Sequence, residues 1–206
     1  MAKVLGGLLG GFSGKVGGLV GGRWKNIQYA RGYVKPANPN TEGQQYYRAR
    51  FKEMAMFAIG ILGSVLNEYM SSMVRSMSAF NWFIKRNTPA KMVDFDPTLV
   101  VMTEGQLYPA AIGNISYIGD SLSVAFSTAI GNNGLTTDLV FALAYKEESS
   151  AFTQAPAEVL RSTGTISLPV LGPTGTFDVY VITCRRDTAG NIKMVGTSQF
   201  KQSVVA

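Results

Sequence analysis

The chain has 206 residues, of which 46% are hydrophobic and only 16% are charged, so it can build a core and is not disordered throughout. It has no histidine and one cysteine. This excludes a disulfide framework, the usual zinc sites and every mechanism that needs an imidazole. No metal or cofactor is expected, and binding or assembly is favoured over catalysis.

The positive charge is concentrated in the first quarter of the chain. Residues 1–52 carry nine basic side chains and one acidic, a balance of +8, while the rest carry ten basic and twelve acidic, a balance of −2. Such asymmetry is typical of a segment that faces nucleic acid, an anionic surface or an acidic partner. A solvated basic face is the simpler alternative.

Residues 1–22 are a glycine-rich arm with an internal near-repeat. Paired glycines separated by paired aliphatic residues occur at 6–11 and again at 17–22. Because glycine weakens regular structure, we expect these glycines to lie where the backbone packs closely against another surface, on a neighbouring subunit. The residues assigned to this assembly arm are Gly10, Gly11, Phe12, Gly14, Gly17, Gly18, Gly21 and Gly22.

The sequence argues against a phosphate-binding loop, a signal peptide and a membrane span. Gly14-Lys15 ends a glycine-rich turn as in a phosphate-binding loop, but Leu9 stands at the first required glycine and Val16 where Ser or Thr is needed. The start is too rich in glycine for a signal peptide. The longest apolar run, 54–66, is too short to cross a bilayer. We expect neither a signal peptide nor a membrane span.

A basic β-ribbon is predicted next, with strands at 16–23 and 27–34 joined by a two-residue turn at Lys25-Asn26. That turn places Tyr29 opposite Gly22, where the aromatic ring covers the bare glycine. We expect one positive strip formed by Arg23, Lys25, Arg31 and Lys35. The candidate contacts for nucleic acid or for a neighbouring subunit are Lys15, Arg23, Trp24, Lys25, Tyr29, Arg31 and Lys35.

Residues 38–92 are predicted to form a helical hairpin. Thr41 and Gln44 have the spacing of a capping box, and a second helix is expected at about 76–85, before Pro89. We expect this hairpin to serve packing rather than to form a site. The apolar stripe of its first helix has helical period and consists of Phe51, Met54, Ala58, Ile61, Leu62, Val65 and Tyr69.

From residue 93 onward, short alternating runs separated by turn residues predict strands. They are expected at 98–103, 114–117, 122–126, 138–145, 164–168, 176–185 and 192–200. Seven strands at this spacing are typical of an immunoglobulin-like or fibronectin-like β-sandwich. The predicted fold class is α+β, with a glycine-rich basic arm and β-ribbon at 1–37, a helical hairpin at 38–92 and a β-sandwich at 93–206.

Two pairs of carboxylates, Asp94 with Asp96 and Glu147 with Glu148, stand near strand ends. Calcium needs several more oxygen ligands than either pair supplies locally. We interpret both pairs as solvated turn residues. Cys184 lies within a predicted strand and is expected to be a small packed side chain.

Three motifs together resemble an uncharacterised bacterial family of about this length. They are a GGFSGKVG-like start at 10–17, a WKG-like turn at Trp24-Lys25 and an NPRTEAQ-like helix entry at 38–44, where Asn40 replaces the arginine and Gly43 the alanine. With Arg48 and Phe51, the last signature is also similar to one in small virion proteins of tailed bacteriophages. The resemblance implies a phage particle component or phage-related protein, located in the virion or, before assembly, in the cytoplasm.

We therefore expect a non-enzymatic structural or assembly protein whose basic, glycine-rich arm packs on neighbouring subunits. Its partners would be further copies of the chain or other virion proteins. One alternative is a nucleic-acid-binding protein that uses the basic ribbon, and another is a surface module that binds glycan or protein through the sandwich loops. An enzyme is least expected, because the chain offers no convincing pair of nucleophile and base.

Overall fold

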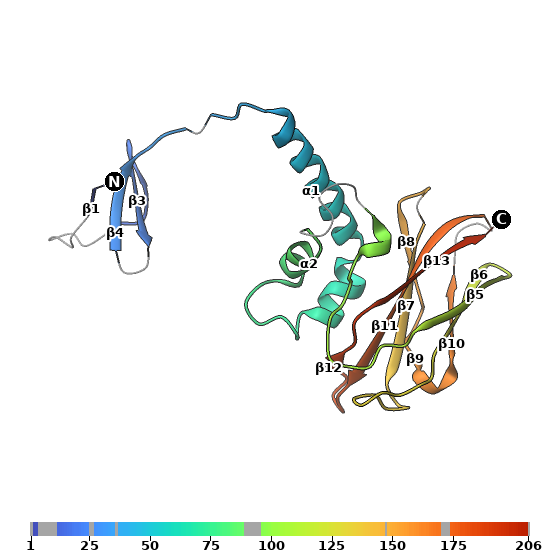
Figure 1. Cartoon of the computed structure of the whole chain (residues 1–206). Coiled ribbons are helices and arrows are strands. Elements are labelled where there is room, and N and C mark those ends of the chain that lie inside the picture. Colours follow the sequence, from blue (N-terminus) through green and yellow to red (C-terminus); the bar gives the residue numbers. More distant parts are fainter. Residues whose placement is uncertain are drawn as a thin grey trace. The chain divides into compact units, whose positions relative to one another are not determined.

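The computed structural model describes residues 2–3, 12–24, 27–35, 37–88, 96–146, 148–169 and 174–205 (Figure 1). The chain divides into two compact units, Met1–Glu42 and Gly43–Ala206. Helices and antiparallel sheets both contribute, so the fold is α+β. Within the described ranges, no helix is both long enough and apolar enough to span a membrane.

The N-terminal unit is a four-stranded antiparallel sheet. Its strand order is β1 (Ala2–Lys3), β4 (Ile27–Gly32), β3 (Leu19–Trp24), β2 (Gly14–Val16). The predicted register is confirmed, because Gly22 lies opposite Tyr29. The single strand predicted at 16–23 is wrong: the chain turns at Gly17-Gly18, with Gly17 at φ +60°, and this turn separates β2 from β3.

The helical segment opens the C-terminal unit. Helix α1 (Glu42–Gly60) begins one residue after Thr41, as predicted. It leads into a π-helix, η1 (Leu62–Met70), that no pattern predicted. Helix α2 (Ala79–Asn87) begins later than expected because the Ser78 side chain accepts a hydrogen bond from the Asn81 backbone N–H and caps the helix there.

Two antiparallel sheets follow. The smaller has the strand order β10 (Thr165–Pro169), β6 (Ser121–Phe126), β5 (Ile112–Ile118). The larger, six-stranded sheet is built on β7 (Leu139–Lys146) and β11 (Gly175–Arg186), which pair with each other. Strands β8 (Ala151–Gln154) and β9 (Val159–Leu160) pair with β7, while β12 (Ile192–Val195) and β13 (Gln199–Val205) pair with β11.

Three details of the predicted strands are wrong. Residues 98–103 form no strand, because the 3-10 helix η2 (Pro97–Leu99) begins there with the Asp96 side chain accepting from the Thr98 N–H. The run 192–200 is divided into β12 and β13. Between them, the Gly196 N–H donates to the Thr183 carbonyl at 2.8 Å. Strands β8 and β9 were not predicted, since their four and two residues are too short to show a period.

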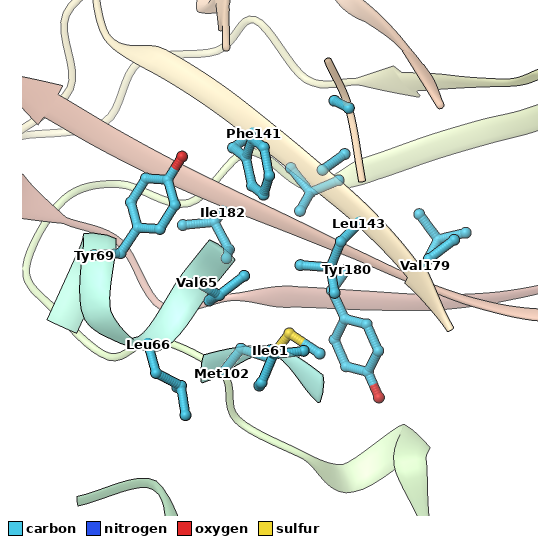
Figure 2. Close-up of a cluster of buried hydrophobic side chains, with 14 of the residues drawn as sticks. Ile61, Val65, Leu66, Tyr69, Met102, Phe141, Leu143, Val179, Tyr180 and Ile182 are labelled. Atoms are coloured by element: carbon cyan, nitrogen blue, oxygen red, sulfur yellow. The ribbon is translucent and has the colours of Figure 1, made fainter. Parts of the chain in front are cut away.

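The six-stranded sheet is covered on both faces, because β7 and β11 are buried along most of their lengths. On one face, side chains of the helical segment pack on alternate strand residues, such as Tyr69 on Phe141 with ring centroids 5.5 Å apart (Figure 2). The intervening strand residues are equally buried, in one cluster with the smaller sheet. They include Val140, Ala142, Val179 and Val181 from the larger sheet and Leu122, Val124, Ile166 and Leu168 from the smaller.

The buried stripe of the helical segment is shorter than predicted. It begins at Met54, which is 5% exposed, and Ile61 is completely buried. Phe51 was expected in this core but is 55% exposed, because it lies on the first turns of α1, where no residue from 42 to 53 is buried. Cys184 is buried, as predicted, and burial raises the pKa of its thiol.

Candidate interaction surface

The candidate contacts lie in the N-terminal unit, where the strand register decides which of them share a face. Lys15 pairs with Val20, and Val20 pairs with Arg31, so Lys15 and Arg31 are on one face of the sheet. Arg23 pairs with Gln28 and stands three residues along β3 from Val20, which places it on the other face. The single positive strip is therefore wrong, because successive residues of a strand point to opposite faces.

One face of the sheet combines cations with aromatic rings. We call it the cationic face, and it holds Lys15, Tyr29, Arg31 and Tyr33. Lys15 Nζ stands 3.7 Å from the centroid of the Tyr33 ring, where an ammonium group is attracted to the ring electrons. The Tyr33 backbone N–H donates to the Gly18 carbonyl at 2.8 Å and holds this residue beside the turn.

The opposite face presents apolar side chains at one end. We call it the apolar face, and it holds Phe12, Val16 and Leu19, with Arg23 farther along β3 on the same side. Val16 and Leu19 pair across β2 and β3 and are 64% and 51% exposed. The Phe12 ring and carbonyl lie where a Cβ at Gly21 would stand. Gly21 is the one residue of this unit that is buried among those the structure describes, so no described residue of the unit covers Val16 and Leu19.

The glycines assigned to the assembly arm differ in why a side chain is disfavoured at their positions. A Cβ at Gly21 or Gly22 would collide with Phe12 or Tyr29 of the same chain. Gly14 and Gly17 instead have φ of +102° and +60°, which side chains disfavour, with open space around them. Gly18 also has open space around it.

Several residues predicted to contact nucleic acid or a neighbouring subunit lie at or beyond the limits of the described ranges. Gly10, Gly11 and Lys25 lie outside the described residues, and Trp24 is described only by its place in β3. Lys35 is exposed and follows β4. Tyr33 stands two residues after Arg31, a spacing that indicates the same face of the strand.

The C-terminal unit holds a network of charged groups that forms a second candidate site. Glu158 accepts hydrogen bonds from Tyr69 Oη at 2.7 Å and from Arg186 Nε at 2.8 Å, and Arg186 Nη2 also donates to Glu68 at 2.7 Å. Burial acts to raise the pKa of Glu158, but the hydrogen bonds from Arg186 and Tyr69 outweigh it and hold that pKa below its ordinary value. The network borders a cavity of about 410 Å³. The network connects Glu68 and Tyr69 of η1 to Arg186 of β11 and to Glu158, the residue before β9.

The two carboxylate pairs have structural partners where they are described. Asp96 caps η2, and Glu148 accepts from the Thr176 backbone N–H at 2.8 Å. Asp94 and Glu147 lie outside the described residues. Within the described part of the chain, no group of three or more histidine, cysteine, aspartate or glutamate residues could hold a metal ion.

Comparison with known proteins places the chain in one family. The model of a family of unknown function, DUF6266, matches residues 11–193, a range that includes strands from both compact units. None of the curated proteins compared with the sequence matches it. The match agrees with the resemblance to an uncharacterised family, and the chain belongs to the family of unknown function DUF6266.

Proposed function

We propose that this chain is a non-enzymatic structural protein that assembles with further copies of itself through the apolar face of its N-terminal ribbon. One observation carries the proposal. Val16 and Leu19 are both more than half exposed in a unit whose only buried residue, within its described part, is a glycine. A sheet this small needs to bury an apolar face to be stable. A partner surface supplies that burial.

The positions of the positive charges on the ribbon permit contact between the apolar faces of two copies. The first quarter of the chain is strongly basic, so two ribbons repel each other where their cations meet. Lys15 and Arg31 are on the cationic face and point away from a contact made through Val16 and Leu19. Two apolar faces can therefore meet at Val16 and Leu19 while these cations remain in solvent. The proposed contact leaves out Arg23, which lies four residues from Leu19 on the same face.

We infer that the two sheets of the C-terminal unit form an immunoglobulin-like or fibronectin-like sandwich, supported by the cluster of buried side chains that they share. This sandwich is the outward module of the assembly. The resemblance of residues 38–44 to phage virion proteins makes a virion the proposed particle.

The mass of the purified protein in solution tests the proposal. We expect a large oligomer for the wild-type chain and a smaller species for Leu19→Asp, since a carboxylate cannot be buried there without a partner. The matched control is Ile118→Asp, at a position of the C-terminal unit that is 67% exposed. Equal masses for wild type and Leu19→Asp would contradict assembly through the apolar face.

The alternative function, nucleic-acid binding, rests on the cationic face. Its interleaved cations and rings can contact phosphates and stack on bases. Co-purification distinguishes the alternatives: a large oligomer without nucleic acid supports the structural function. A monomer or dimer that retains nucleic acid supports the alternative.

A further inference from the structure

The first turns of α1 are exposed among the described residues of the C-terminal unit. Residues 42–49 and 51–53 are all exposed. On one side of these turns, Ala49 and Lys52 border a cavity that strands β7 and β8 also line. Two large side chains are conspicuous there, Tyr47 at 56% exposure and Phe51 at 55%. A helical segment of this length gains little stability on its own in water.

Tyr47 and Phe51 continue the buried stripe of the same helix. The stripe advances by alternating steps of four and three residues, the spacing at which one helix packs along another. Only its later members are covered within the chain, with Met54, Ala58 and Ile61 all at 5% exposure or less. The full stripe is Tyr47, Phe51, Met54, Ala58 and Ile61.

We propose that Tyr47 and Phe51 pack against the same residues of other copies of the chain, in a parallel helical bundle formed by the first turns of α1. The occupant is a helix because the steps of four and three match a helical partner. It is the same segment because an identical stripe is complementary to itself in a parallel arrangement. This interface is distinct from the apolar face of the ribbon and does not depend on it.

Charge and size select the parallel orientation. With Tyr47 and Phe51 at the seam, parallel packing places Arg48 beside Gly43 of the second copy and Arg50 beside Ala55. Each arginine then lies beside a small, uncharged residue. An antiparallel pair centred at Ala49 would instead bring Arg48 beside the second copy's Arg48, and Arg50 beside its Arg50. Like charges so placed are unfavourable.

Cysteine cross-linking in the full chain tests the proposal, because the native Cys184 is completely buried. Tyr47→Cys places a thiol at the seam. Ala49→Cys is the matched control, since its position is also exposed but faces away from the seam. We expect a disulfide-linked dimer from Tyr47→Cys under mild oxidation and none from Ala49→Cys or wild type. Equal cross-linking of the two variants, or none in either, would overturn the proposal.

Two further samples test whether the helices are parallel and whether their interface is independent of the ribbon. In a mixture of Tyr47→Cys and Phe51→Cys chains, parallel packing gives like-with-like dimers, whereas dimers formed only between the two variants would overturn the parallel orientation. Tyr47→Cys combined with Leu19→Asp should still cross-link, which separates this interface from the ribbon's. Loss of the cross-link there would overturn the claim that the interface is independent.

Removal of an aromatic anchor gives a quantitative check. We expect Phe51→Asp to raise the dissociation constant of self-association about tenfold or more, the loss typical of a central aromatic residue. Ala49→Asp, with the same new charge placed away from the seam, should change it little. A Phe51→Asp chain that associates as tightly as wild type would overturn the proposal.

Discussion

Tyr29 lies across the ribbon from Gly22, and its ring occupies the space that a side chain at Gly22 would need. The neighbouring Gly21 is also crowded, by Phe12, but there the obstacle includes a backbone oxygen. This difference between two adjacent glycines leads to a prediction about the stability of the ribbon.

We expect Gly21→Ala to disrupt the ribbon and Gly22→Ala to be tolerated. A Cβ at Gly22 would stand 2.7 Å from Tyr29 Oη, the free end of a side chain that can turn away. A Cβ at Gly21 would require the backbone at Phe12 to move. Hydrogen exchange of the β3 amides measures the effect, and faster exchange in Gly22→Ala than in Gly21→Ala would contradict the interpretation.

The two faces of the ribbon predict different effects of charge reversal on nucleic-acid binding. If the alternative function holds, Arg31→Glu should weaken binding and lower the log-log salt slope by about one unit for each phosphate that the variant no longer neutralises. Arg23→Glu, on the other face, should leave the slope unchanged. Titration of a fluorescent oligonucleotide at several salt concentrations measures both. Equal effects at the two positions would contradict binding restricted to the cationic face.

We expect Ile61→Ala and Phe51→Ala to differ in their effect on the free energy of unfolding of the monomer, although both residues belong to the helical stripe. Ile61 is completely buried, so its truncation should lower the free energy of unfolding by about 2–5 kcal/mol. Phe51 is 55% exposed, and its truncation should change that free energy by about 0.5 kcal/mol or less. Urea unfolding at low protein concentration measures both, with the exposed Lys52→Ala as control. A large loss for Phe51→Ala would place this side chain in the core of its own chain.

The network around Glu158 predicts acid-sensitive stability. The pKa of this carboxyl is below its ordinary value of 4.5 in the folded chain. The contribution of this carboxylate to the free energy of unfolding is therefore complete above pH 4.5, and it is lost as the pH falls through the pKa of the folded state. Glu158→Gln should lower the free energy of unfolding by about 1.5–3 kcal/mol at neutral pH, as for the removal of a hydrogen bond to a charged group. The variant should also lose less stability than the wild type as the pH falls.

Thermal melting from pH 7 to 3 measures this dependence. The control is Glu53→Gln, which removes an exposed pair with Arg50 at 3.2 Å and should cost less than about 1 kcal/mol. A variant at Glu158 that keeps the acid dependence of the wild type would assign that dependence to other carboxyls.

Features that depend on near neighbours in the chain could be predicted from the amino-acid sequence. The start of α1 at Thr41-Glu42 and the pairing of Gly22 with Tyr29 across a two-residue turn both follow from local rules. The class α+β with antiparallel sheets follows from the change from helical to alternating periods. Family membership also agrees with a resemblance carried by short motifs.

Where burial ends along α1, and which residues share a face of the sheet, depends on contacts between segments far apart in the sequence. Phe51 and Met54 both belong to the stripe of helical period, yet only Met54 is covered, because burial depends on packing with residues far away in the chain, and Met54 alone of the two joins the buried cluster. Arg23 and Arg31 are close in the sequence, but the register across β3 and β4 puts them on opposite faces of the sheet. The network of Glu68, Glu158 and Arg186 joins residues far apart in the chain, and no local pattern encodes such an arrangement.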